Sequence, residues 1–544
     1  CNHQSFNQKE TKLKFGIALV CRNEQHILRR RFPDMAKTPS LKLFHLVKSL
    51  TGSEKRYFKI FINSKDPANN KYVRLFDAIE AQPEFDEAQL MKSVYGDEPV
   101  ETRKYSELKA YLHDLILKSL QFYDENSSVD YRVKNLLMDV RTAFKRSWFD
   151  DAKDLLRKAK RVAEKYEDFN ALLEILNWEK RIAYAQMDIP FLDRELERIM
   201  QEEHTCLENL QNISAYRSIF FKILVSIRKD VSRREQQVQA LRSLMEDPLL
   251  QDEKQAGSFT AKVLYHRIYT IFHFSTSDFE AFYKSSKTLL KLMESNPAML
   301  GEDVSEYISA LSNHVVSCGR LEKIEEVRAT LDKLIKVKPI NLDDEVKIHQ
   351  QYYNNKFRLC IATGEFEEGK KELQKHLETI EKFDRQHFSK SEFYFQYFYL
   401  NFGAGDFEKA LDCLNDWLKL PDTVERKDLQ SLARILNLII HFELGNTVLL
   451  DSLLRSTQRY LRKEDRLSAF EQKMMQFIRE AGKPHSKKEK RAALETLKLD
   501  FERLPKSPSF GMFDLISWLE SKISGKPFAA VVRDAFRKKA GVSA

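Results

Sequence analysis

Apolar residues recur at helical spacing along most of the chain, with charged and polar residues between them. The clearest stretch covers residues 105–122. Its apolar positions fall three or four residues apart, on one face of a helix: Leu108, Leu112, Leu115, Ile116 and Leu120. No stretch sustains the apolar–polar alternation of a half-buried strand, and 15 Gly and 14 Pro in 544 residues leave few breaks. The pattern predicts an all-α protein.

One short pattern repeats between these helical stretches. Residues 405–411 read Gly-Asp-Phe-Glu-Lys-Ala-Leu, residues 364–370 read Gly-Glu-Phe-Glu-Glu-Gly-Lys, and residues 319–324 read Gly-Arg-Leu-Glu-Lys-Ile. Weaker copies begin at Ser147, Ser277 and Gly445, and degenerate copies at residues 187–190 and 228–231 are candidates. From Ser277 onward the copies lie about 40–45 residues apart.

The repeated pattern is suited to joining two antiparallel helices. Gly accepts the left-handed conformation that closes a helix C-terminus. The acidic or polar residue after it suits the start of the next helix, where backbone N–H groups lack partners. The aromatic residue or Leu that follows can pack back against the preceding helix. A fixed period of this length predicts stacked helical hairpins, an α-solenoid.

The turn resembles that of tetratricopeptide (TPR) repeats, in which the second helix opens with a small residue, a polar one, an aromatic, two polar ones and Ala. Residues 405–410 match this order, and residues 364–369 nearly match it. The resemblance covers roughly residues 130–480 and implies a right-handed solenoid. The period is longer than the roughly 34 residues of TPR repeats, which predicts longer helices, and the Trp–Leu–Gly–Tyr pattern of the first TPR helix is mostly absent.

Four regions are expected along the chain. Residues 1–34 read poorly as a helix and are expected to be disordered or a non-native extension, with a natural start at Met35. One alternative makes Cys1 the lipid-bearing first residue of a processed lipoprotein. Residues 35–129 form a helical region in which Thr38 or Ser40 caps a first helix, 130–480 hold the repeats, and 481–544 form a C-terminal helical cap.

The composition gives the chain a mild positive charge, and its cysteine usage indicates a reducing compartment. The 90 Lys and Arg against 81 Asp and Glu give a net charge of +9, which permits contact with nucleic acid without arguing for it. The six cysteines form no Cys-x-x-Cys pair, and most lie in apolar helical stretches. This favours a reducing compartment, so a cytoplasmic location is expected. No apolar window is long enough to span a bilayer.

Catalytic signatures are missing. The chain has no phosphate loop, dinucleotide fingerprint, His-Glu-x-x-His or Gly-x-Ser-x-Gly motif. His266 and His273 could share a helix face but lack further ligands, and the pair His204 and Cys206 is isolated. We expect no enzyme activity, no cofactor and no metal site.

The sequence therefore favours a scaffold or adaptor that binds a protein or peptide. If the TPR-like register holds, outward-facing positions of the first helices line the concave face. These partner-binding candidates are Asn313, Asn354, Arg358, Phe395 and Tyr399. Asn can both donate to and accept from a peptide backbone, and Arg can fork onto a carboxylate. The alternatives are an RNA- or DNA-binding helical repeat, whose binding would weaken steeply with salt, and a solenoid that responds to a small ligand.

The densest aromatic run, residues 393–399, allows two interpretations. Its rings are expected to pack in the core between long helices. The alternative places some of them on the concave face as a recognition platform.

Overall fold

The structure is a computed structural model. It describes residues 41–63, 71–96, 101–124, 128–228, 234–383, 393–419, 427–463, 469–481, 487–503 and 513–539. The described residues contain helices and no strands, as the hydrophobic pattern predicted. The expected extension at residues 1–34, the start at Met35 and the cap at Thr38 or Ser40 lie outside the described residues.

The contacts divide the chain into two compact units, with the boundary between Asn212 and Ile213. The boundary falls inside α10 (Ile189–Arg228), the longest helix. The region boundaries expected from the sequence remain predictions.

The unit that ends at Asn212 contains two hydrophobic clusters, one within residues 43–116 and one within residues 129–206. Before α10, its helices are α2 (Lys42–Ser49), α3 (Gly52–Asn63), α4 (Lys71–Ala81), α5 (Glu87–Tyr95), α6 (Thr102–Tyr123), α7 (Val129–Lys145), α8 (Phe149–Lys165) and α9 (Phe169–Ala185). A capping box, formed by the sequence Thr-Gly-Ser-Glu at residues 51–54, begins α3. The Glu54 carboxylate accepts from the Thr51 amide at 2.6 Å, and Thr51 Oγ1 accepts from the Glu54 amide at 3.3 Å.

The unit that starts at Ile213 also contains two hydrophobic clusters, within residues 289–359 and 346–532. After α10, its helices are α11 (Arg234–Met245), α12 (Phe259–Thr276), α13 (Phe279–Glu294), α14 (Pro297–Glu302), α15 (Val304–Arg320), α16 (Ile324–Ile335), α17 (Leu342–Thr363), α18 (Phe366–Ile380), α19 (Tyr394–Gly403), α20 (Phe407–Leu418), α21 (Lys427–Glu443), α22 (Thr447–Lys463), α23 (Ala469–Ala481), α24 (Lys487–Arg503), α25 (Leu515–Ser524) and α26 (Phe528–Lys539). Two short 3₁₀ turns, Pro248–Leu250 and Glu253–Gln255, precede α12.

One turn joins many of the consecutive helices. At each copy a residue with positive φ is followed, two positions later, by the first residue of the next helix. The residue between them donates its amide to the carbonyl five positions back, as Asp406 does to Asn401 at 2.9 Å. This is the Schellman arrangement, which pairs carbonyls left free at a helix end. The positive-φ residues of these turns are Ser147, Glu167, Met187, Ser277, Glu322, Gly364, Gly405 and Gly445.

The predicted turns between helices at Ser147, Ser277, Gly364, Gly405 and Gly445, and the one at the degenerate copy that begins at Met187, are therefore confirmed as turns. The prediction of a turn at Gly319 was wrong. Gly319 lies inside α15, and Glu322 takes the left-handed conformation with φ +58°. The sequence aligned Leu321 with Phe407, whereas Ile324 is the apolar residue that opens the next helix. The copy at residues 228–231 lies mostly outside the described residues.

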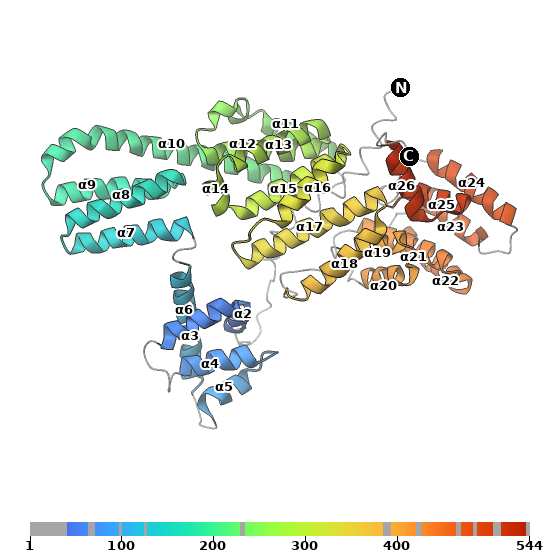
Figure 1. Cartoon of the computed structure of the whole chain (residues 1–544), viewed down its shortest axis with the longest axis horizontal. Helices are drawn as coiled ribbons and strands as arrows, with labels where there is room; N and C mark the ends of the chain where they lie inside the picture. The colour runs from blue at the N-terminus through green and yellow to red at the C-terminus, as the bar shows by residue number, and fades with distance from the viewer. Residues whose placement is uncertain are drawn as a thin grey trace. The chain divides into compact units, whose positions relative to one another are not determined.

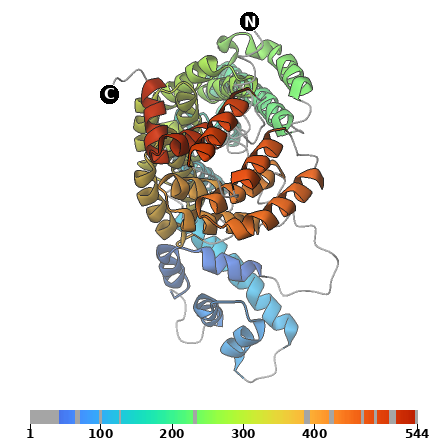
Figure 2. The ribbon, with the colours of Figure 1, turned by 90° about the vertical axis from the view of Figure 1, so that its right-hand side faces the viewer.

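The helices of the 213–544 unit pack in a regular order (Figure 1). Successive long helices contact each other, and α15, α17 and α19 also contact the helix two positions ahead or behind. The last helix, α26, packs against α17 and α25. Figures 1 and 2 show it beside helices that precede it by more than 100 residues in the chain.

The aromatic run on α19 forms part of the core. Phe393, Phe395, Tyr397, Phe398 and Tyr399 are all buried in the largest hydrophobic cluster. The core interpretation of this run is therefore confirmed for these rings.

Candidate binding pocket

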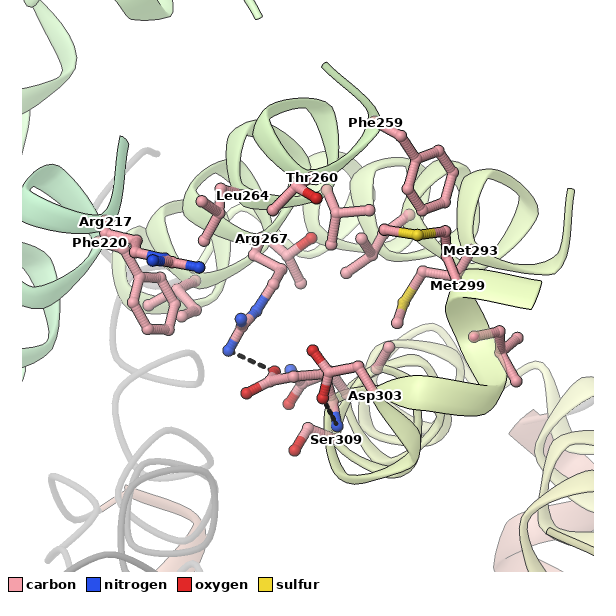
Figure 3. Close-up of a pocket in the computed structure, with 18 of the residues that line it drawn as sticks. Arg217, Phe220, Phe259, Thr260, Leu264, Arg267, Met293, Met299, Asp303 and Ser309 are labelled. Atoms are coloured by element: carbon pink, nitrogen blue, oxygen red, sulfur yellow. Dashed lines mark hydrogen bonds and ion pairs between the residues drawn. The ribbon is translucent and has the colours of Figure 1, made fainter. Parts of the chain in front are cut away.

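A pocket lies between helices α10, α12, α13, α14, α15 and α17, within the 213–544 unit (Figure 3). Its volume is about 390 Å³, within the range of sites that hold small ligands or side-chain anchors. Three local caps set the helices that surround it. Ser258 caps α12, Asn296 caps α14 and Asp303 caps α15, each accepting a hydrogen bond from a backbone amide in the first turn.

Much of the pocket lining is apolar. Rings and flexible thioethers gather there, and Met side chains adapt their shape to an apolar guest. Figure 3 shows Phe259, Met293 and Met299 on one side of the cavity. The apolar lining residues are Phe220, Phe221, Leu224, Phe259, Val263, Leu264, Ile271, Leu289, Met293, Met299, Leu300 and Ala310.

Charged side chains lie between these apolar residues in the lining. Arg267 forms an ion pair with Glu306 from α15, and its guanidinium lies 4.3 Å from the centre of the Phe220 ring. The Lys347 ammonium donates to the Ser305 carbonyl at 2.8 Å and to its hydroxyl at 2.7 Å. Burial lowers the pKa of Lys347. Burial also raises the pKa of Asp303, with Glu306 adding repulsion.

Arg217 supplies a cation at the edge of the pocket. Its side chain is exposed, and none of the described acidic residues forms an ion pair with it. An exposed arginine next to an apolar cavity suits a ligand that carries an apolar group close to a carboxylate, because guanidinium and carboxylate can form paired hydrogen bonds.

The five residues proposed from the sequence fall in different environments. Asn313 is half-buried and lines the pocket, as Gln351 does. Asn354 is only 2% exposed and accepts a hydrogen bond from Gln396 at 2.8 Å. Arg358 is half-buried, and burial lowers the pKa of its guanidinium to about 9, with repulsion from Arg320 contributing.

The two aromatic candidates pack inside the fold. Phe395 contacts Tyr399 and Trp417 ring to ring. The Tyr399 hydroxyl accepts a hydrogen bond from the Asp514 amide at 2.9 Å, and its ring contacts Phe513 and Phe528. The structure thus places Asn313 at the pocket and the other four outside it. A partner-binding role for any of the five stays a prediction.

Sequence reasoning missed the pocket because its lining comes from six helices between residues 217 and 351. The local signal was weak: Phe220, Phe221 and Leu224 read as one apolar face of a long helix. It also missed a group of possible metal ligands between α15 and α16, namely His314, Cys318 and Glu326. The His-x-x-x-Cys spacing at 314 and 318 could have indicated it. The isolated pair His204 and Cys206 does not form a ligand set in the structure. The His204 imidazole is exposed beside Glu208, whereas the Cys206 thiol is buried.

A buried chain of histidines links α17, α18 and α19. His349 Nε2 lies 2.9 Å from His376 Nδ1, and His376 Nε2 lies 2.5 Å from the Tyr397 hydroxyl. Burial lowers the pKa of His349 from 6.5 to about 4. The folded protein therefore keeps His349 neutral at pH values where the unfolded chain binds a proton.

This lowered pKa predicts a loss of stability in acid. As the pH falls from about 6.5 towards 4, unfolding takes up a proton at His349, so the folded state loses on the order of 2 kcal/mol from this group. His349→Gln cannot titrate and should reduce the loss. Hydrogen exchange of α17 at about pH 7 and about pH 5 measures this loss of stability in the unchanged protein and in the variant. His204→Gln, at an exposed imidazole, is the control, and an unchanged pH dependence in His349→Gln contradicts the assignment.

The comparisons with known proteins do not assign this chain to a family, so its class is defined by its fold alone. No protein-family model, no curated protein and no solved structure matches this chain. None of the helices in the described part of the chain combines the length and apolar character needed to cross a membrane. The chain is an all-α protein with a charged and apolar pocket.

Proposed function

We propose that this chain is a non-enzymatic binding protein, a right-handed α-solenoid of TPR-like hairpins, that takes a segment of a protein partner into the pocket. The observation that carries the proposal is the pocket itself, whose lining combines apolar and charged side chains, with Arg217 exposed at its edge. The recurrence of one turn between successive helices supports the repeat assignment.

The pocket favours a particular kind of segment. An apolar anchor such as Leu, Met or Phe would pack against Phe259, Met293 and Met299. A neighbouring acidic side chain or C-terminal carboxylate would pair with Arg217. A central apolar anchor with a polar rim is the usual arrangement of binding energy at protein interfaces.

Filling the pocket should abolish most of this binding. Thr260 is half-buried on α12 and lines the pocket, so Thr260→Phe would place a ring where the anchor sits. We expect affinity for a peptide selected on the intact protein to fall at least about tenfold, or about 1.4 kcal/mol. The matched control is Thr288→Phe, the same change at an exposed position of α13 outside the pocket. Fluorescence anisotropy with the labelled peptide measures both.

Charge reversal at Arg217 tests the second part of the proposal. Arg217→Glu should weaken binding of a peptide with an acidic residue and reduce its dependence on salt. Arg242→Glu, at an exposed position of α11, is the control.

Two outcomes would contradict the proposal. Equal peptide affinities in Thr260→Phe and Thr288→Phe would show that the peptide does not bind in the pocket. If capture from native lysate yields only nuclease-sensitive complexes, the nucleic-acid alternative replaces the proposal.

A further inference from the structure

Three potential metal ligands converge between α15 and α16. His314 and Cys318 are four residues apart on α15, so they share one face of the helix. Glu326 lies in the first turn of α16, just after the Schellman turn at Glu322. The same i, i+4 spacing on a helix places two zinc ligands side by side in known metalloproteins.

The distances between the three ligand atoms fit a tetrahedral ion. Cys318 Sγ lies 3.5 Å from His314 Nε2 and 3.7 Å from Glu326 Oε2. His314 Nε2 and Glu326 Oε2 are 3.8 Å apart. Zinc bonds of about 2.0–2.3 Å separate neighbouring tetrahedral ligands by roughly 3.4–3.6 Å. The three side chains need to close by only a few tenths of an ångström.

Outer hydrogen bonds already orient two of the ligands. Ser286 Oγ lies 2.9 Å from His314 Nδ1, which leaves Nε2 directed at the cluster. The Tyr283 hydroxyl donates to both Glu326 oxygens, at 2.9 and 2.8 Å. It can stay on Oε1 while Oε2 binds an ion. Such outer partners fix the ring orientation and raise ligand basicity at zinc sites.

The cluster is open to solvent on one side. His314 and Cys318 are buried, whereas the Glu326 side chain is 39% exposed. The Lys287 ammonium lies 3.7 Å from Glu326 Oε2 and opposes a cation, but its side chain is 45% exposed and can turn into solvent. An ion can therefore enter past Glu326, and water can fill a fourth position.

We propose that His314 Nε2, the Cys318 thiolate and Glu326 Oε2 bind one Zn²⁺, with water as the exchangeable fourth ligand. A mixed set of sulfur, imidazole and carboxylate ligands suits zinc among the common divalent ions. Binding releases the thiol proton to solvent and changes no oxidation state. The ion ties α15 to α16.

Cobalt provides the direct test, because Co²⁺ occupies zinc sites and reports a thiolate ligand by its ultraviolet charge-transfer band. Titrating the metal-free, untagged full chain with Co²⁺ should give this band together with tetrahedral visible bands, and one equivalent of Zn²⁺ should remove them. Cys318→Ser should lose the band and lower zinc affinity at least about 100-fold, beyond the 10–100-fold cost of losing an outer partner.

The chain supplies a matched control. Cys360 is another buried thiol in the same unit, on α17, and Cys360→Ser should bind both metals normally. Ser286→Ala should lower zinc affinity about 10–100-fold through the orientation of His314. Glu326→Gln changes a partly exposed side chain, so it keeps the test valid if Cys318→Ser misfolds, and it should weaken zinc binding. Absence of the cobalt band, its survival in Cys318→Ser, or equal loss in Cys360→Ser overturns the proposal.

Discussion

Gly403→Ala should destabilise the helical core around α18 and α19 by about 3 kcal/mol or more, at the upper end of overpacking costs. A methyl group at Gly403 would lie 2.1–2.4 Å from three ring atoms of Phe366. Phe366 is 1% exposed and packs against Tyr399 and Phe528, so the ring has no free space to enter. Hydrogen exchange of α18 and α19, together with the thermal unfolding midpoint, measures the loss.

Gly319→Ala is the control, and its expected effect has the opposite sign. Gly319 lies in α15, is exposed, and has nothing within 4 Å of an added methyl group. Alanine there should stabilise the helix by about 0.5–1 kcal/mol, because it restricts the unfolded chain. Equal stabilities of the two variants would show that Gly403 and Phe366 do not pack as described.

These two glycines also show what a single sequence reveals. Both lie in helices, yet the sequence marked Gly319 as a turn. The turns at Gly364 and Gly405 were predicted correctly because their signal is local: a left-handed residue, a capping residue and an aromatic within three positions. At Gly319 the same reading misplaced the turn by three residues, because Glu322 adopts the left-handed conformation without being glycine.

The candidate sites depend on contacts that a local pattern does not encode. Tyr399 was expected at an outward-facing position if the TPR-like register held, but the amide that donates to its hydroxyl belongs to Asp514, 115 residues later. Asn313 was selected for a concave face and does line the pocket, although that pocket also needs α10 and α12. Helical periodicity fixes which side chains share a face of one helix. It leaves open which other helix covers that face.

The second large effect concerns α26, whose Phe528 ring contacts Tyr399. Gly364→Ala should release α26 from α17. Gly364 has φ +74°, and an added methyl group would lie 2.9 Å from the Arg533 amide nitrogen and 3.1 Å from the Ala529 carbonyl oxygen. These are backbone atoms of α26, so the helix as a whole must move. We expect a loss of about 3 kcal/mol, of which about 1–2 kcal/mol is left-handed strain.

Gly405→Ala separates the strain from the helix contact. Gly405 has φ +79°, closes α19 in the same kind of turn, and has nothing within 4 Å of an added methyl group. It should therefore cost only the strain. Hydrogen exchange of residues 528–539 should accelerate at least about tenfold in Gly364→Ala and stay near normal in Gly405→Ala. Equal exchange in both variants would mean that close backbone packing at Gly364 does not hold α26. Faster exchange in Gly364→Ala alone would mean that this contact does hold α26, the helix whose Phe528 ring packs against Tyr399.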